Sequence, residues 1–296
     1  MIYITGASGR VGRRVLKLLP EAIPLVRKKT GLKKEIITNF SEEELKKIFK
    51  NAKVIIHLAG SMNFLNHYEL WEANVKLTER IVNAAPKDAR IIFASSISVY
   101  GKEMKEIPAN ENTPLDPDTP YAKSKSFAED FVKKHPNYVI LRLGTIYGPE
   151  FEDYSLILRM IKEGKMQILG EGRNRVSFIH VDDAAKVIVN AVKKGKGIYV
   201  VSGESETQEN ILTIAAGLLK VPVPTKKVPV FMALLFAQAE EMKASMSKSK
   251  PTITQEHVRI LSSDRAFDCS KAKKELGFKS MKIKEGIEEI VKNMKN

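Results

Sequence analysis

Short apolar runs alternate with amphipathic stretches along the first half of the chain. Runs rich in β-branched residues, typical of buried strands, lie at 2–4, 54–59, 90–95 and 138–144. Stretches with the apolar spacing of helices lie between them, at 11–19, 41–50, 68–85 and 120–134. A weaker strand is expected at 23–26, because Pro24 lacks the amide hydrogen that a sheet ladder uses. This alternation predicts an α/β fold, with a parallel sheet and crossover helices.

The first strand leads into three glycines and then directly into a helix. Gly6 permits a tight turn, Gly9 lets backbone N–H groups approach a pyrophosphate, and Gly12 lets the helix pack closely on the strand. The start of the helix adds free donors and a positive dipole end. The context of strand, turn and helix favours a dinucleotide-binding loop. An ordinary glycine turn is the alternative, because three glycines alone are weak evidence.

Tyr121 and Lys125 stand four residues apart in a predicted helix, so their side chains share one face. A free tyrosine has a pKa of roughly 10, and a neighbouring ammonium lowers it by favouring the phenolate. The pair therefore predicts a proton-transfer site. Ser95, Ser96 and Ser98 lie where a predicted strand ends, at the sheet edge where such folds bind ligands. Capping of the turn is their alternative role.

Composition narrows the classes of function. The net charge is +14, but the basic residues are dispersed without aromatic interleaving, so we expect no nucleic-acid partner. The longest apolar run, near 228–239, is shorter than the roughly 20 residues of a membrane-spanning helix, so no stable membrane insertion is expected. A single cysteine, Cys269, and a strand in place of a signal peptide favour a cytoplasmic location.

Seven segments, in this order, resemble motifs of the extended short-chain dehydrogenase/reductase family, also called the NAD-dependent epimerase/dehydratase family. They are TGASGRVG (5–12), HLAG (57–60), SSISVYG (95–101), YAKSK (121–125), LRLGTIYGP (141–149), FIHVDDAA (178–185) and FDCSKAKKELGF (267–278). The resemblance implies a Rossmann-type doubly wound parallel sheet with a smaller C-terminal α/β substrate domain. We expect the NAD(P)-binding domain to be formed by 1–147, with 178–197 returning to it, and the substrate domain by 148–177 and 198–296.

The same resemblance implies the residues of the site. Ser96, Tyr121 and Lys125 match the catalytic triad of the family. Tyr121 would move the proton, Lys125 would lower its pKa and hold the nicotinamide ribose, and Ser96 would orient the substrate oxygen. The other expected substrate contacts are Asn63, Ser98 and Thr145. The expected cofactor contacts, besides Tyr121 and Lys125, are Gly6, Ser8, Gly9, Arg10, Val11, Gly12, Arg27, Lys28, Asn39, Phe40, Leu58, Ala59, Gly60, Asn74, Ala94, Ser95 and Leu143.

The end of the second predicted strand indicates which cofactor is used. An NAD-selective site places Asp or Glu there to bind the ribose 2′-hydroxyl, whereas residues 26–29 contain no acid. Arg27 can instead form a bidentate contact with the 2′-phosphate, and Lys28 and Arg10 are alternatives. We therefore expect a preference for NADP(H), with NAD(H) as the alternative.

The resemblance implies an NAD(P)-dependent oxidoreductase that transfers hydride at a hydroxyl/carbonyl carbon. A nucleotide-sugar epimerase or dehydratase is the first alternative. Thr145 and Val176–Phe178 depart from the Asn and the Arg-Asp-Phe common in those members, which favours a reductase for a small or apolar substrate; Arg173 and Arg175 still offer charge for a diphosphate. A non-catalytic NADP(H)-binding regulator is the second alternative, although such proteins typically lose the tyrosine or the lysine.

Several other features have structural interpretations. His57 and His180 lie in apolar runs without metal-ligand spacing, so we expect structural histidines and no metal site. Asp182 and Asp183 match a structural segment of the family. The stretch 231–242 is apolar on more than one side, which favours a core or interface helix over membrane contact and leaves a lid over the substrate open. The family often dimerises through helices of the Rossmann domain, so a homodimer is considered.

Overall fold

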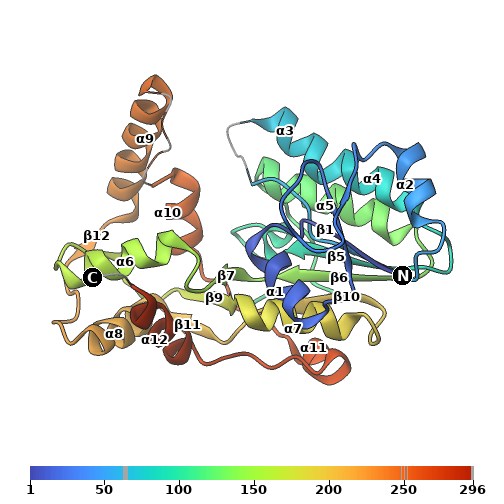
Figure 1. The fold of residues 1–296 in the computed structure, drawn as a ribbon. Helices are drawn as coiled ribbons and strands as arrows, with labels where there is room; N and C mark the ends of the chain where they lie inside the picture. Colours follow the sequence, from blue (N-terminus) through green and yellow to red (C-terminus); the bar gives the residue numbers. More distant parts are fainter. Residues whose placement is uncertain (63–65, 248, 250, 252, 295–296) are drawn as a thin grey trace.

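The computed structural model describes all residues of the chain except 63–65, 248, 250, 252, 295 and 296. Its centre is a seven-stranded parallel sheet, with the order β10-β6-β5-β4-β1-β2-β3 (Figure 1). In that order the strands are Gly197–Val201, Tyr138–Leu143, Arg90–Ser96, Val54–His57, Ile2–Thr5, Ile23–Val26 and Ile36–Ile37. The predicted Rossmann-type sheet is therefore confirmed.

Helices cover both faces of this sheet, because alternate strand residues point to opposite sides. Tyr3 and Ile55 pack with Leu45 on one face, and Ile4 and Ile56 pack with Val15 on the other. The first face carries α2 (Glu42–Phe49), α4 (Leu77–Ala84) and α5 (Pro120–Lys133), and the second carries α1 (Arg10–Leu18), α7 (Val181–Ala191) and α11 (Ser270–Leu276) (Figure 1).

Capping residues fix where the helices near the sheet edge begin. Thr119 caps α5, with its Oγ1 accepting a hydrogen bond from Ala122 N at 3.1 Å, and Pro120 occupies the first helical position. Ser41 caps α2 in the same way, from Glu44 N. The cap of α5 places Tyr121 in the first turn of the helix, next to the carboxyl end of β5.

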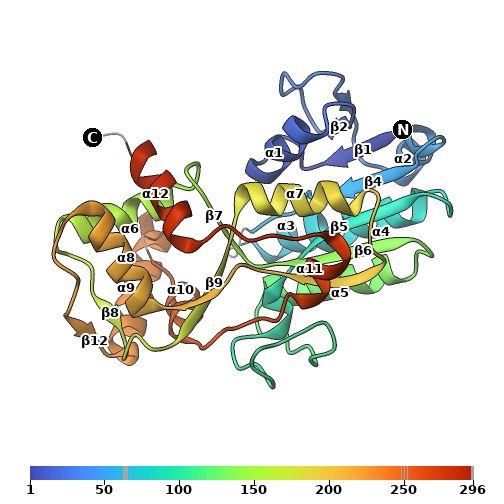
Figure 2. The same cartoon turned by 90° about the horizontal axis from the view of Figure 1, so that it is seen from below.

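The second half of the chain builds a smaller body (Figure 2). This body has its own apolar core, which includes Tyr147, Leu158, Leu212 and Ile287. Its strands are β7 (Thr145–Tyr147), β8 (Ile168–Leu169), β9 (Arg175–His180), β11 (Ser205–Thr207) and β12 (Lys227–Val228). Its helices are α6 (Glu152–Lys162), α8 (Gln208–Leu219), α9 (Val230–Ser247), α10 (Gln255–Ser262) and α12 (Ile283–Asn293).

The exchange of segments between the two bodies differs in detail from the expectation. Residues 178–180 belong to β9, which pairs with β7 and β11 in the small sheet, so the return to the Rossmann body begins at α7. The return continues past residue 197, because β10 runs to Val201 in the central sheet. The segment around α11 also packs there, through Phe267, Cys269 and Leu276.

Three local features were not expected from the sequence pattern. The short strand β3 was not predicted, and β4 ends at His57, so Leu58 and Ala59 lie beyond it. The stretch expected as one helix at 68–85 is α3 (His67–Trp71), a π-helical turn (Glu72–Lys76) and α4. No helix in the described part of the chain has both the length and the hydropathy to cross a bilayer.

Candidate active site

The glycine loop has the close packing that a dinucleotide-binding turn needs. Gly6 adopts φ 70°, and a Cβ on Gly12 would lie 2.2 Å from Gly6 O, so neither position accepts a side chain without a shift of backbone. Gly9 precedes α1 without any side-chain cap, and the first turn holds no acid. The backbone N–H groups of this turn and the helix dipole therefore suit a pyrophosphate, so the residues present fit a dinucleotide.

The loop after β4 lies directly against this turn. Ala59 N donates to Thr5 Oγ1 at 3.2 Å, and a Cβ on Gly6 would lie 2.6 Å from Ala59 N. The expected contacts Leu58, Ala59 and Gly60 are thus brought next to the glycine loop.

The buried His57 side chain, directly before this loop, connects β1 to α4. Its Nδ1 lies 2.8 Å from Thr5 Oγ1 and its Nε2 lies 2.9 Å from Thr78 Oγ1. Burial lowers the pKa of His57 to about 3, so the ring is neutral. His57 is therefore a structural residue that joins β1, β4 and α4.

Asn74 lies in the π-helical turn and is fully buried. Its Oδ1 accepts from Ser61 N at 2.7 Å, and its Nδ2 donates to Ser61 O at 3.0 Å and to Ser124 Oγ at 2.9 Å. These contacts hold the 58–61 loop against α5. The expected contact of Asn74 with the cofactor remains a prediction, while the side-chain hydrogen bonds seen here go to the protein and position the loop.

The three residues of the expected triad meet where β5 ends and α5 begins. The hydroxyls of Ser96 and Tyr121 are hydrogen-bonded, and Ser96 Oγ also accepts from Ser98 N at 3.1 Å. Lys125 Nζ lies 4.5 Å from the centroid of the Phe93 ring and within 3.8 Å of where a Cβ on Gly60 would be. The triad is thus continuous with the glycine loop through the 58–60 segment.

The proton affinities of Tyr121 and Lys125 are shifted mainly by burial. Burial raises the pKa of Tyr121, and the hydrogen bond with Ser96 opposes that rise only in part. The expected lowering of the Tyr121 pKa by Lys125 is therefore not met, because desolvation of the phenolate dominates. Burial lowers the pKa of Lys125 to about 8, although the carboxylate of Glu129 raises it.

A buried ion pair between Glu129 and Arg142 lies near Lys125, and it was not predicted from the sequence. Glu129 accepts from Arg142 Nε at 3.0 Å and from Arg142 Nη2 at 2.8 Å, and both residues are buried. Ser95 Oγ donates to Glu129 Oε1 at 2.6 Å, and Arg142 Nη1 donates to the Tyr100 hydroxyl at 2.7 Å. The spacing could have indicated this contact, because Glu129 follows Lys125 by four residues and so lies on the same face of the helix. Ser95 was expected at the cofactor, but its hydroxyl is taken up by this network.

The outer end of the expected cofactor site is basic. Arg27 and Lys28 follow β2 and are exposed. Glu35, the nearest acid after them, accepts hydrogen bonds from the Thr30 hydroxyl and from the backbone N–H groups of residues 30–32, and these bonds lower its pKa. Arg10 lies elsewhere, with its guanidinium 4.5 Å from the centroid of the Phe151 ring.

Other expected contacts vary in how accessible they are. Phe40 has φ 61° and its side chain is buried in the core with Tyr3 and Phe49, so it offers no side-chain contact to a cofactor. Asn39 is exposed, and its Oδ1 accepts from Ser41 N at 2.6 Å. Ser8, Gly9 and Arg10 are exposed, Gly6, Val11, Ala94 and Ser98 are half-buried, and Gly12 and Leu143 are buried.

The other residues expected to contact the substrate are Asn63, Ser98 and Thr145. Thr145 opens β7 and is exposed, while the buried Ser98 Oγ has no hydrogen-bond partner in the described part of the chain. Asn63 lies outside the described residues. Arg175 forms a bidentate ion pair with Asp264, at 2.9 Å and 2.7 Å, so one of the two arginines considered for a diphosphate is already neutralised.

The acids that follow β9 connect parts of the fold, as expected. Asp183 accepts from Met281 N at 2.6 Å, and Asp182 lies 3.3 Å from the Arg14 guanidinium. His180 caps α7, and its Nε2 lies 3.3 Å from Glu289 Oε2. His180, Asp182 and Glu289 come within 4.8 Å of one another, but Arg14 already supplies positive charge to this group.

Comparison with known proteins agrees with this geometry. A model of the NAD dependent epimerase/dehydratase family matches residues 2–202. A putative UDP-glucose 4-epimerase from Methanocaldococcus jannaschii is 30% identical over 72% of this chain and 80% of its own length. A putative dihydroflavonol 4-reductase from Synechocystis is 23% identical over 98% of this chain and 93% of its own length.

A solved structure shows the same fold. The UDP-glucose 4-epimerase from Thermotoga maritima, determined with UDP-glucose, superimposes with a TM-score of 0.76 at 19% identity, over 99% of this chain and 97% of that one. With the family match, the glycine loop and the Ser96, Tyr121 and Lys125 cluster, the chain belongs to the NAD-dependent epimerase/dehydratase family of enzymes.

Proposed function

We propose that the protein is an NADP(H)-dependent reductase or dehydrogenase that acts on a hydroxyl/carbonyl pair of a small or apolar substrate. The observation that carries this proposal is the hydrogen bond between Ser96 and Tyr121, beside a Lys125 that adjoins the glycine loop. These residues are positioned to orient a substrate oxygen, exchange a proton with it and hold a dinucleotide.

The chemistry divides between the protein and the cofactor. When bound, the dinucleotide supplies the hydride to the carbonyl carbon or accepts it from the alcohol. Ser96 donates a hydrogen bond to the substrate oxygen and holds it near the Tyr121 hydroxyl. Because burial raises the pKa of Tyr121, its phenol is protonated at neutral pH and acts as the acid that gives the carbonyl oxygen its proton during reduction. The proton returns to Tyr121 in the oxidative direction.

The position of Lys125 suits a second task. Its ammonium lies near the 58–60 loop and is largely desolvated, which strengthens its interaction with hydroxyl groups of a bound ribose. Lys125 would thereby fix the nicotinamide end of the cofactor beside Tyr121.

Two observations favour a reductase over a nucleotide-sugar epimerase. Arg175 is paired with Asp264, which removes one charge from those available for a substrate diphosphate. The similarity to the putative reductase extends over 98% of the chain, beyond the 2–202 region that the family model matches, whereas that to the putative epimerase covers 72%. A UDP-sugar 4-epimerase is the second candidate, supported by the higher identity of 30% to the putative epimerase.

The NADP(H) preference rests on the loop after β2. Glu35 is the acid that could reach a ribose 2′-hydroxyl, but its carboxylate is occupied by donors from residues 30–32. Arg27 and Lys28 remain exposed in the neighbourhood where the 2′-phosphate would lie. NAD(H) remains the alternative.

Replacement of Tyr121 by Phe tests the proposed acid. Tyr121→Phe should lower kcat by about 10²- to 10⁴-fold, the usual contribution of general acid catalysis, with little change in cofactor Kd. Steady-state kinetics and cofactor titration measure the two effects. Turnover of Tyr121→Phe at the wild-type rate would remove Tyr121 from the mechanism.

Replacement of Arg27 tests the cofactor preference. Arg27→Ala should weaken NADPH binding by about 10-fold or more, as expected for the loss of a charge-assisted contact of about 1.5–3 kcal/mol, and leave NADH binding unchanged. Lys33→Ala, an exposed lysine farther along the same loop, is the matched control. Tighter binding of NADH by the wild type would contradict the preference.

A further inference from the structure

Helix α9 has one side turned toward the protein and one side that the rest of the described chain leaves bare. Ala237 and Ala244 are its buried residues, and Glu241 accepts hydrogen bonds from Gln255 N and Nε2 of α10, both at 2.9 Å. At about 100° per residue, these three positions define a single face. This face packs on α10, and α9 stands out from the rest of the molecule (Figure 1). The expectation of a core helix is therefore not met, because only two alanines are buried.

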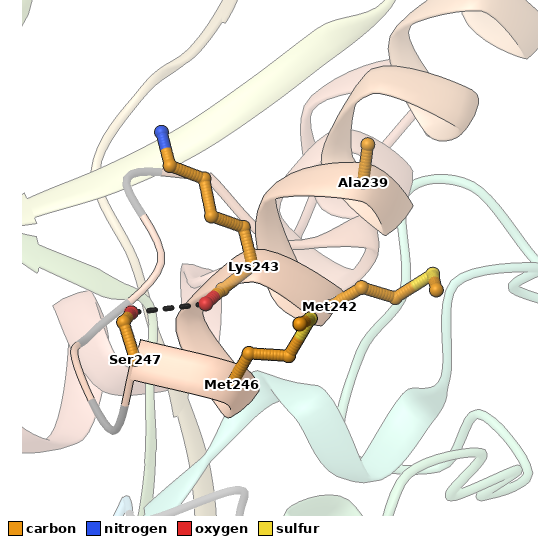
Figure 3. Close-up of a pocket in the computed structure, with 5 residues that line it drawn as sticks. All are labelled: Ala239, Met242, Lys243, Met246 and Ser247. Atoms are coloured by element: carbon orange, nitrogen blue, oxygen red, sulfur yellow. Dashed lines mark hydrogen bonds between the residues drawn. The ribbon is translucent and has the colours of Figure 1, made fainter.

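The opposite face carries large apolar side chains along the whole length of the helix. Phe231 is 64% exposed, Leu235 61%, Met242 62% and Met246 87%. We call the set the apolar stripe; it consists of Phe231, Met232, Leu235, Phe236, Ala239, Met242 and Met246. Figure 3 shows Met242 and Met246 extending together from the last turns of α9, with Lys243 pointing away from both.

The width of the apolar stripe limits what can cover it. From Phe231 to Phe236 it spans about 140° of the helix surface, wider than the seam that one partner helix covers in a coiled coil. A second copy of α9 would therefore leave Met232 or Phe236 in water. A lipid surface covers a broad stripe completely, because the apolar face of an interfacial helix sinks about 5–10 Å into the headgroup boundary.

The charge of the whole chain favours the same occupant, whereas α9 itself carries Glu240, Glu241 and Lys243. The chain carries a net charge of +14, and the Lys243 side chain is 79% exposed beside the apolar stripe, 3.9 Å from Glu240. Lysines at the border of an apolar helix face reach the headgroups while their stems lie along apolar surface. We propose that the apolar stripe of α9 docks the protein onto the surface of an anionic lipid bilayer, with the helix lying in the interface and not crossing it.

Vesicle flotation of the full-length protein tests this proposal. The wild type should float with vesicles of phosphatidylglycerol and phosphatidylcholine in equal parts, and less with phosphatidylcholine alone. Leu235→Glu/Met242→Glu should reduce the bound fraction by about tenfold or more, because each side chain loses its apolar transfer into the bilayer. Both positions are exposed, so the variant should keep the wild-type Tm.

Gln238→Glu/Ser245→Glu is the matched control, since it adds the same charge to exposed positions of α9 outside the stripe. It should retain most of the binding. Failure of the wild type to float would overturn the proposal, as would equal losses in the two double variants. A dimer seen by sedimentation without lipid, and lost only in Leu235→Glu/Met242→Glu, would assign the stripe to a second copy instead. None of these readouts depends on catalytic activity.

Discussion

Two neighbouring features shift the pKa of Lys125 in opposite directions. Burial disfavours the ammonium, and Glu129, one turn farther along α5, favours it, with the pKa left at about 8. Glu129 is itself held by Arg142, Ser95 and Lys133. The network therefore acts as a positioning group that keeps Lys125 charged at neutral pH.

Replacement of Glu129 by Gln should move the alkaline limb of the pH–rate profile to lower pH. In the wild type, activity that needs the ammonium should fall as the pH rises through about 8. Removal of the neighbouring negative charge lowers the Lys125 pKa further, so the fall begins earlier. The measurement is kcat/KM against pH, and an unchanged limb would contradict the role of Glu129.

Stability separates this effect from simple damage to the fold. Glu129→Gln leaves the buried Arg142 guanidinium without its carboxylate and should cost about 3–5 kcal/mol in the free energy of unfolding. Glu129→Gln/Arg142→Met removes both charges and should recover much of that loss, yet keep the shifted pH limb. Denaturant unfolding of the two variants, beside their pH profiles, checks both parts.

The backbones of the glycine loop and the start of α1 are in close contact, and we expect cofactor binding to depend on this packing. A Cβ on Gly12 would lie 2.2 Å from Gly6 O and 2.7 Å from Ala7 Cα, both in backbone. Gly12→Ala should therefore destabilise the fold by about 1–3 kcal/mol and weaken cofactor binding. Gly217→Ala is the control, because Gly217 lies in α8 with nothing near its Cβ position, and it should stabilise by up to about 1 kcal/mol. Thermal unfolding and cofactor titration measure the contrast, and an unperturbed Gly12→Ala would contradict it.

The elements also show how far local pattern determines structure. Strands β1, β4, β5 and β6 were predictable because each is a short apolar run that the sheet buries on both faces. The π-helical turn at 72–76 was not, because it arises where Asn74 bonds to Ser61, which no local periodicity records. The two-residue strand β3 was missed because its pairing with β2 depends on tertiary context.

The same contrast holds for the candidate site. Ser96, Tyr121 and Lys125 were identified because their spacing and neighbours match family motifs, and the structure brings them together. The contacts of Ser95 and Phe40 were not predictable from motifs. The Ser95 hydroxyl donates to the buried Glu129 carboxylate, and the Phe40 side chain packs in the apolar core. The pKa of Tyr121 also depends on burial, which the sequence alone does not specify.

The whole molecule consists of the body built on the seven-stranded sheet and a smaller body that carries α9. The chain passes between the two bodies more than once. Strand β9 belongs to the smaller body, whereas β10 and α11, which follow it in the sequence, pack in the Rossmann body. The family resemblance leads us to expect two domains, whereas the points at which segments pass between the two bodies depend on which sheet each strand joins. The homodimer considered from the family remains a prediction.

Transfer of deuterium from NADPH labelled at the reactive C4 position distinguishes a reductase from a nucleotide-sugar epimerase. The protein should be incubated with labelled NADPH and a panel of small and apolar ketones, and separately with UDP- and dTDP-sugars. We predict net oxidation of the cofactor with one deuterium in an alcohol product, and no 4-epimer from the sugars. Efficient epimerisation with no net change in cofactor would contradict this account and establish the epimerase alternative.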